Sequence, residues 1–300
     1  MKLVIGTRSS SLAQWQAKEV ANQLQQIGID SELCFIQTLG DAVQNIALTT
    51  IGETGVFTKA LDEALVSGKI DIAVHSAKDM PGRLQEGIQV SAALKRADAH
   101  DVVLTCTEDA HLENMNRRLV VGTGSVRRQA FMKHYYPFHE TRLIRGNIDT
   151  RIQKLRNGEY DLILLAKAGV MRSGYQELIC QQLSLHTFVP AAGQGTIAIT
   201  TCTENKAAHQ IISKISHSES AIRLAAERAF LQEVEGGCQL PVFAYATIMV
   251  DNLIIWGGIS STDGVTLVQH SLEGVTSEPT KLGKTLAQKI LTEYPLTTKH

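Results

Sequence analysis

Short apolar runs alternate with amphipathic stretches along the first two thirds of the chain. The run Leu3-Val4-Ile5 predicts a first strand, and apolar residues at helical spacing between Leu12 and Ile27 predict a helix that ends at Gly28. Further apolar runs predict strands at 34–36, 70–74, 88–93, 102–104, 119–121, 143–144 and 162–165, with a helix over 59–66. Strands and helices in alternation predict α/β domains built on largely parallel sheets.

The pattern changes twice along the chain. A second unit begins near Arg96, where a polar segment precedes the strand at 102–104. From about residue 218 the regular alternation gives way to a long helix over 220–234, strand-like runs at 242–250 and 253–258, and a last helix near 282–291. This change predicts a third, smaller α+β domain at the carboxyl end.

Composition limits the classes of protein to which the chain can belong. Its 300 residues are 44% hydrophobic and 20% charged, which is ordinary for a globular protein of two or three domains. The formal net charge is -1, so we expect no nucleic-acid partner. The amino terminus enters a strand instead of a signal peptide and no apolar run has the length of a membrane span, so we expect a cytoplasmic protein without membrane contact. Five widely spaced cysteines and scattered histidines indicate neither a disulfide framework nor a metal site.

Two charged side chains follow the apolar run at 70–74. Lys78 and Asp79 stand between this predicted strand and Pro81-Gly82, where regular structure ends. In open α/β sheets, ligands bind at the carboxyl edge of the strands, so these two residues are candidates for chemistry. A surface ion pair before a turn explains the same residues equally well at this stage.

Arginines recur at the turns between predicted strands and helices. After the strand at 119–121, Ser125 is a good N-cap, the glycines beside it let a ligand approach the backbone, and two arginines follow. Each arginine alone is more often a solvated surface charge. Six at such turns suggest a ligand with several carboxylates or phosphates, and the turns lack the glycine patterns of nucleotide sites. The six are Arg8, Arg127, Arg128, Arg145, Arg151 and Arg172.

One cysteine is a candidate nucleophile. Cys238 follows Gly236-Gly237, which stop the preceding helix and leave the next side chain on a constrained loop. A lone loop cysteine is more often an inert thiol. The residues alone therefore leave both interpretations open.

Five segments resemble one known family, in its order and across nearly the whole chain. That family is hydroxymethylbilane synthase, also called porphobilinogen deaminase. Its Gly-Gly-Cys-Gln and His-Ser-x-Lys-Asp-x-Pro motifs are highly specific together, and this chain has both. The matching segments are His75-Ser-Ala-Lys-Asp-Met-Pro81, Gly122-Thr-Gly-Ser-Val-Arg-Arg-Gln129, Arg145-Gly-Asn147 with Thr150-Arg151, Ala192-Gly-Gln-Gly195, and Glu227-Arg-Ala-Phe230 with Glu235-Gly-Gly-Cys-Gln239.

The resemblance implies a fold and a reaction. Two domains that resemble periplasmic binding proteins would flank a cleft, residues 1–95 with 196–215 and residues 96–195, and a third domain would cover 216–300. The strand-like run at 196–200 and the helix-like run at 206–215 fit the returning segment. Four porphobilinogen molecules would be joined head to tail, with loss of ammonia, onto a covalently bound dipyrromethane, and water would then release the tetrapyrrole. The implied partners are porphobilinogen and the elongating polypyrrole chain, and the implied oligomeric state is a monomer.

The resemblance also implies a role for each candidate residue. Asp79 would be the catalytic carboxylate, which stabilises positive charge after ammonia is lost and manages the proton at the leaving amine. Cys238 would hold the dipyrromethane through a thioether, with further cofactor contacts from Lys78, Ser76, Thr123, Ser125, Arg127 and Arg128. The implied substrate residues are Arg8, Ser10, Arg145, Arg151 and Arg172. No metal takes part.

Several positions depart from the family pattern. Gly52-Glu53-Thr54-Gly55 stands where the family has Gly-Gly-Lys-Gly, so a lysine of a loop over the cleft is missing and an acid is added. Ser11, Gly124 and Lys167 replace a usual proline, serine and small residue. Two other functions stay open: a diverged member that carries the cofactor but turns over weakly, and a non-catalytic module that binds polycarboxylates. The module predicts no covalent adduct, and the full motif around Cys238 speaks against it.

Overall fold

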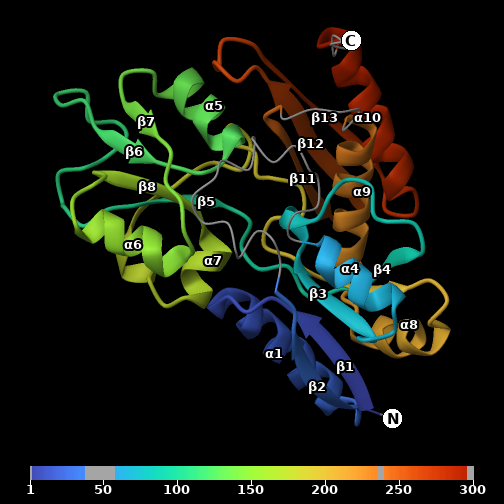
Figure 1. Cartoon of the computed structure of the whole chain (residues 1–300). Helices are drawn as coiled ribbons and strands as arrows, with labels where there is room; N and C mark the ends of the chain where they lie inside the picture. The colour runs from blue at the N-terminus through green and yellow to red at the C-terminus, as the bar shows by residue number, and fades with distance from the viewer. Residues whose placement is uncertain (1, 38–57, 235–239, 296–300) are drawn as a thin grey trace. The chain divides into compact units, whose positions relative to one another are not determined.

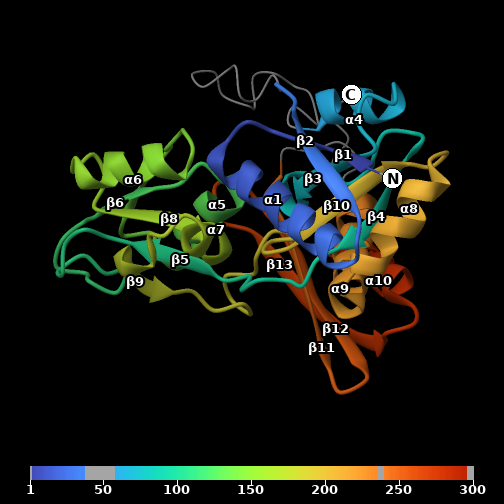
Figure 2. The same cartoon turned by 90° about the horizontal axis from the view of Figure 1, so that it is seen from below.

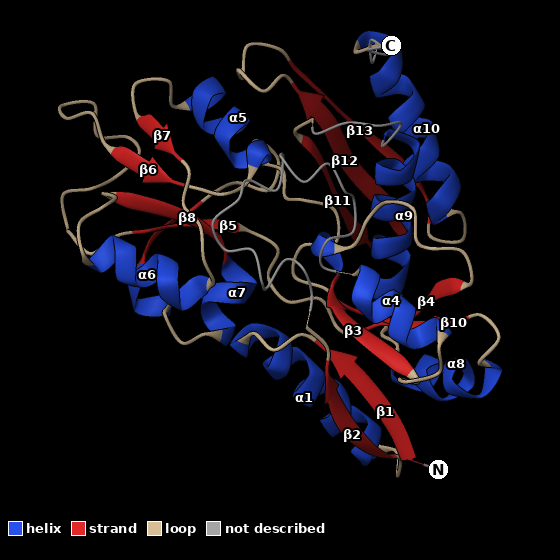
Figure 3. Cartoon of the chain, in the orientation of Figure 1, coloured by secondary structure: helices blue, strands red, loops and turns tan. Residues whose placement is uncertain are grey.

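The computed structural model describes residues 2–37, 58–234 and 240–295. Within these ranges helices and strands alternate, and the strands form three sheets (Figure 3). The chain divides into two compact units (Figure 1): unit 1 is Met1–Ala97 with Gly193–Leu224, and unit 2 is Asp98–Ala192 with Ala225–His300. The chain therefore passes from one unit to the other at 97–98, at 192–193 and at 224–225.

A five-stranded mixed sheet forms the centre of unit 1. Its strands are β1 (Lys2–Thr7), β2 (Asp30–Phe35), β3 (Ile72–Ser76), β4 (Ile88–Ala93) and β10 (Ile197–Cys202), in the order β2-β1-β3-β10-β4. β1 is parallel to β2 and β3, whereas β10 is antiparallel to both of its neighbours. Four of the five strands therefore run in the same direction, as expected for a largely parallel sheet, and β10 runs against them. β10 belongs to the segment that returns from unit 2, so no crossover helix within unit 1 holds it parallel to β3.

Helices cover both faces of this sheet (Figure 2). On one face, α1 (Ser11–Gln26) and α8 (Lys206–Ile212) bury Leu24 and Ile212 against a core that includes Val74. On the other face, α4 (Lys59–Val66) buries Leu61 beside Ala73. Val74 and Ala73 are successive residues of β3, so their opposite directions follow from the two-residue period of a strand. The short 3-10 helices η1 (Ala77–Asp79) and η3 (Ser213–Ile215) also belong to unit 1.

Unit 2 contains a second five-stranded mixed sheet. Its strands are β5 (Asp101–Leu104), β6 (Val120–Gly122), β7 (Glu140–Arg142), β8 (Leu162–Ala166) and β9 (Ile179–Gln182), in the order β7-β6-β8-β5-β9. β6 is parallel to β7 and β8, and β5 is antiparallel to β8 and β9. The predicted strand at 143–144 is wrong, because β7 ends at Arg142 and the Leu143 carbonyl accepts a hydrogen bond from the Tyr160 hydroxyl at 2.9 Å.

Helices also lie on both faces of the second sheet. α5 (Val126–Tyr135) packs Phe131 against the face that carries Val103 and Leu164. α6 (Ile148–Arg156) and α7 (Lys167–Arg172) cover the face that carries Val102 and Leu165. A 3-10 helix, η2 (Gln176–Leu178), leads into β9.

The carboxyl-terminal part of the chain is a three-stranded antiparallel sheet with two helices. Its elements are α9 (Ser218–Val234), β11 (Val242–Met249), β12 (Asn252–Ser260), β13 (Leu267–Val275) and α10 (Pro279–Glu293). A Cβ atom on Gly283 of α10 would lie 2.1 Å from the Ala226 carbonyl oxygen of α9, so only glycine allows the two helices to approach this closely. The predicted fold class, α/β with a smaller carboxyl-terminal α+β part, is confirmed. None of the helices in the described ranges is both long and apolar enough to cross a membrane.

Candidate functional site

A pocket opens in unit 1 between two strand-to-helix turns. The turn after β1 contributes Arg8 and Ser10, and the turn after β3 contributes Ser76 and Asp79. The space between the two turns, including its open mouth, is about 410 Å³. Since the carboxyl ends of parallel β1 and β3 lie at one edge of the sheet, the two turns meet there. The structure thus brings four of the predicted site residues together.

Local hydrogen bonds hold both turns in place. Ser10 caps α1, and its hydroxyl accepts a hydrogen bond from the Ala13 N–H at 3.4 Å. β3 ends at Ser76, and η1 then carries Lys78 and Asp79. Gly193 packs beneath η1 with a φ of 76°, and a Cβ at that position would lie 2.8 Å from the Ala77 Cβ. Its lack of a side chain therefore lets the 193–195 segment support the turn that presents Asp79.

A third strand-to-helix turn, in unit 2, presents the amino end of α5. Ser125 is the N-cap of this helix, and its hydroxyl accepts from the Arg128 N–H at 3.4 Å. The buried Thr123 hydroxyl accepts from the Ser125 N–H at 3.3 Å. At Gly124 a Cβ would lie 2.9 Å from the Ile144 carbonyl oxygen and 3.6 Å from Nη2 of Arg151. A serine in this backbone position would force the turn or its neighbours to shift, so the departure from the family pattern at Gly124 matches the local packing.

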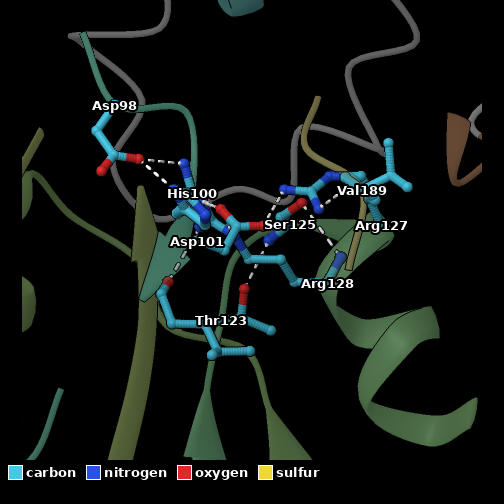
Figure 4. A network of polar contacts seen from close by, with 9 residues as sticks. Asp98, His100, Asp101, Thr123, Ser125, Arg127, Arg128 and Val189 are labelled. Carbon is cyan, nitrogen blue, oxygen red and sulfur yellow. Dashed lines mark hydrogen bonds and ion pairs between the residues drawn. The ribbon is translucent and has the colours of Figure 1, made fainter. Parts of the chain in front are cut away.

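Two predicted arginines share one buried carboxylate (Figure 4). Arg127 donates from Nη2 to Asp101 Oδ2 at 2.6 Å, and Arg128 donates from Nη2 and Nε to Asp101 Oδ1 at 2.7 and 3.1 Å. Arg127 Nη1 also donates to the Val189 carbonyl at 2.8 Å, and Arg128 Nη1 to the Leu164 carbonyl at 3.0 Å. The Asp101 side chain is fully buried, and the two guanidinium groups are nearly so. Burial lowers the pKa of Arg127, although the charge of Asp101 raises it.

This cluster carries more positive than negative charge. Two guanidinium groups face one carboxylate, so one positive charge stays unbalanced within the set Arg127, Arg128 and Asp101. Burying such an excess is costly without a further anion nearby. Asp101 was not among the predicted site residues, although a lone acid at the start of an otherwise apolar strand could have pointed to it.

The remaining predicted arginines of unit 2 lie at the start of α6 and at the carboxyl end of α7, so Arg172 is not at a strand-to-helix turn as predicted. Asn147 caps α6 and accepts from the Thr150 N–H at 2.8 Å. Arg151 donates from Nε to the Gly146 carbonyl at 2.9 Å, and Arg145 immediately precedes this glycine. Arg172 is the last residue of α7. Their roles toward a ligand stay predictions, as do those of Lys78 and the pocket residues.

Comparison with known proteins decides the family. The family model "Porphobilinogen deaminase, dipyromethane cofactor binding domain" matches residues 3–210, and "Porphobilinogen deaminase, C-terminal domain" matches residues 221–292. The chain belongs to the porphobilinogen deaminase family. The porphobilinogen deaminase of Desulfosudis oleivorans is 42% identical over 97% of this chain and 94% of that protein, and that of Cytophaga hutchinsonii is 41% identical over 96% and 92%.

Solved structures show a weaker likeness. The VFT2 domain of Bordetella pertussis BvgS, as a double mutant, superposes with a TM-score of 0.43 and 15% identity over 72% of this chain and 85% of that domain. A score at this level carries no functional implication. The family assignment of this porphobilinogen deaminase relative therefore rests on its sequence.

One departure from the family pattern is accommodated by an ion pair. Lys167 Nζ lies 2.7 Å from Asp98 Oδ2, and the other oxygen of Asp98 accepts from the His100 N–H at 3.0 Å. Although burial opposes ionisation, the hydrogen bonds from Lys167 and His100 lower the pKa of Asp98 to about 2. Lys167 in this member of the porphobilinogen deaminase family thus has an anionic partner at the start of unit 2.

Some predicted positions lie outside the described residues. Cys238, Glu53 and Thr54 are among them, so their predictions stay as they were made. In the ranges that are described, no three His, Cys, Asp or Glu side chains are grouped as metal ligands would be. Among the described residues, the predicted site residues of unit 1 line its pocket or lie beside it, and those of unit 2 lie on its helices and the turns before them.

Proposed function

We propose that the chain is a hydroxymethylbilane synthase. It would join four porphobilinogen molecules head to tail with release of ammonia, and water would then free the linear tetrapyrrole for haem and other tetrapyrrole synthesis. Membership of the porphobilinogen deaminase family over nearly the whole chain supports the assignment. The observation that carries it is the unit 1 pocket, where the Asp79 carboxylate shares one site with the cation of Arg8. Porphobilinogen needs both, since it has a cationic aminomethyl arm and two carboxylate arms.

The unit 2 turns fit a dipyrromethane that bears carboxylates. The unbalanced positive charge of Arg127, Arg128 and Asp101 would be neutralised by a cofactor carboxylate. Lys78, Thr123 and Ser125 would add further contacts to the cofactor, and Cys238 would bind it covalently through a thioether. When bound, the dipyrromethane supplies an electron-rich pyrrole carbon to which the first substrate is joined.

The protein's own residues would handle the charges of the substrate. The carboxylate arms would be held by guanidinium and hydroxyl groups, from Arg8, Ser10, Arg145, Arg151 and Arg172. Asp79 would stabilise the positive charge that develops as ammonia leaves, and would manage the proton at the departing amine. This role suits a carboxylate at the rim of a pocket, because Asp79 is exposed and open to an incoming amine.

The organisation of the protein is part of the same proposal. We infer three domains, residues 1–95 with 196–215, residues 96–195 and residues 216–300. We also infer a cytoplasmic monomer that uses no metal. Gel filtration with light scattering would test the oligomeric state, and a dimer mass would contradict it.

The mass of the intact protein tests the covalent cofactor. Protein made in cells that form porphobilinogen should be heavier than its sequence by two linked pyrrole units, and Cys238→Ser should remove this increment. Cys106→Ser is a matched control, because Cys106 is an exposed free thiol that should leave the increment unchanged. A native mass equal to the bare sequence would instead favour the non-catalytic polycarboxylate-binding module.

Substitution of Asp79 tests the catalytic role. Asp79→Asn keeps the shape and removes the charge, so we expect turnover to fall by roughly 10²- to 10⁴-fold while folding survives. Asp30→Asn is the control, since Asp30 is exposed at the opposite, amino end of β2 and should keep full activity. Near-normal turnover by Asp79→Asn would remove this residue from the mechanism. Weak turnover by the wild type, with its mass increment intact, would identify a diverged member.

A further inference from the structure

One buried amide in the unit 1 pocket has no part in the function proposed above. Gln16 lies on the inner face of α1 and is only 2% exposed, yet it lines the pocket together with Arg8 and Asp79. A buried carboxamide needs hydrogen-bond partners, because leaving it unpaired costs free energy. Among the residues that the structure describes, the side-chain partner of Gln16 is the hydroxyl of Ser76.

The geometry of this pair fixes where the hydroxyl proton lies. Gln16 Nε2 is 2.8 Å from Ser76 Oγ, and Gln16 Oε1 is 3.1 Å from the same oxygen. Ser76 Oγ therefore accepts one hydrogen bond from the amide and donates its own proton back to it. Both amide atoms are within hydrogen-bond distance, so the result does not depend on which end of the amide is nitrogen.

A hydroxyl held in this way can accept a further hydrogen bond but cannot donate one. A serine oxygen has one proton and two lone pairs, and Gln16 takes up the proton and one lone pair. The remaining lone pair can accept a hydrogen bond from an N–H or an ammonium group. It cannot bind a carboxylate, because an ionised carboxylate also only accepts hydrogen bonds. At the end of β3, Ser76 and Asp79 thus present acceptors, whereas the turn after β1 contributes the donors of Arg8. The ring of His75 also lines the pocket, and its Nε2 lies 3.0 Å from the Thr200 hydroxyl.

We propose that Gln16 is a positioning residue that holds Ser76 as a hydrogen-bond acceptor for the aminomethyl ammonium group of the substrate. This inference rests on the proposed function, and it moves Ser76 from the predicted cofactor contacts to the amine of the substrate. The pocket would then distinguish the two ends of porphobilinogen by polarity. Its carboxylate arms meet the donors at the turn after β1, and its amine meets the acceptors at the turn after β3.

The inference predicts a selective loss of recognition. In Gln16→Met the side chain keeps its length but cannot hold the Ser76 proton, so the hydroxyl is free to rotate. Steady-state assays of the holoenzyme should show a KM for porphobilinogen that is raised roughly tenfold, as expected for one lost hydrogen bond to a charged group, with kcat within about twofold. A competitive pyrrole dicarboxylate that lacks the aminomethyl group should keep its inhibition constant within about twofold. An equal rise of the KM for porphobilinogen and of the inhibition constant would mean that the substitution has only deformed the pocket, and would overturn the inference.

Two further variants separate positioning from structure. Ser76→Ala should raise KM as much as Gln16→Met, and the double variant should resemble either single variant, because both act through one hydrogen bond. Gln23→Met is the matched control on the same helix, since the Gln23 amide bonds only to Glu19 among the described residues, outside the pocket, and its KM should not change. Additive effects of Gln16→Met and Ser76→Ala, or an unchanged KM in Gln16→Met, would refute the inference. A wild-type protein without the mass increment would refute the proposed function first, and this inference would fall with it.

Discussion

Asp62 is a buried acid whose charge should destabilise the protein at neutral pH. It lies in the first turn of α4, is 5% exposed, and follows Leu61, which packs in the core beneath that helix. Burial raises its pKa from 3.8 to about 6; the hydrogen bond with the Thr58 side chain lowers it and the neighbouring charge of Glu63 raises it. The folded protein therefore binds a proton at Asp62 more tightly than the unfolded chain does.

The sign and size of the effect follow from proton linkage. Because the pKa in the folded state is raised, the stability that depends on protonated Asp62 is fully present below pH 3.8 and is lost as the pH rises through about 6. A shift of about two units corresponds to at most about 3 kcal/mol at 1.36 kcal/mol per unit. Solvent close to the end of α4 screens the charge of Asp62, so we expect ionised Asp62 to lower the free energy of unfolding by about 1 to 2 kcal/mol. Asp62→Asn should raise the free energy of unfolding by this amount at about pH 7.5 and by roughly half as much at about pH 5, where the carboxyl group is already ionised in the unfolded chain but still mostly protonated in the folded protein.

Urea unfolding of the two proteins between about pH 5 and about pH 7.5 measures this difference. The contributions of the groups that both proteins share cancel when the variant is subtracted from the wild type. Asp98, whose pKa is about 2, stays ionised throughout and adds no slope. Glu86→Gln is the control, because Glu86 is exposed and should change the free energy of unfolding by less than about 0.5 kcal/mol. A difference between wild type and Asp62→Asn that does not grow with pH would refute the reasoning.

Three further substitutions test other parts of the structure by their free energies of unfolding. Gly283→Ala should destabilise by about 1 to 3 kcal/mol, because its Cβ would lie 2.1 Å from the Ala226 carbonyl oxygen; an unchanged thermal midpoint would show that the two helices separate easily. Asp101→Asn should destabilise by about 3 to 5 kcal/mol, since it leaves two buried guanidinium groups without their carboxylate, and a loss below about 1 kcal/mol would mean that water reaches the cluster. Ser125→Ala should lose about 1 kcal/mol as the cap of α5, whereas Ser125→Asp should keep it; equal losses in both variants would argue against a capping role.

The parts of the fold that periodicity alone determines were predictable. The helix over Lys59–Val66 and the strand over Ile88–Ala93 have the predicted bounds, and Gly28, with a φ of 76°, follows the first helix as expected. In these segments the spacing of apolar residues, a stop signal and burial on one face all agree. The turns that carry Ser125 and Asn147 were also predictable, because capping depends on a few neighbouring residues.

Elements that depend on distant partners were not predictable in the same way. β13 (Leu267–Val275) was not anticipated, since Gln269, His270 and Ser271 interrupt its apolar pattern and its pairing with β12 defines it. The direction of β10 depends on the path of the chain through unit 2, which no local pattern records. Both cases follow from the weak intrinsic preference of strands compared with the effect of their neighbours.

The same limit explains why some parts of the site could not be found by reasoning from the sequence. Arg127 and Arg128 were predicted from their turn, but the carboxylate they share is on β5, 26 and 27 residues earlier in the chain. Gln16 is separated from Ser76 by 60 residues, and on α1 alone it reads as one more buried position of an amphipathic helix. A motif identifies which side chains can contact a ligand. The ion pairs and hydrogen bonds that each side chain makes within the protein determine which charge, proton or lone pair is still available to that ligand. Two guanidinium groups against one carboxylate leave a positive charge, and a serine whose proton is held by an amide leaves a lone pair. The unbalanced positive charge and the available lone pair determine which groups the site can bind. Substitutions at Asp101 and Gln16 should therefore alter ligand binding, although neither residue is in a predicted motif.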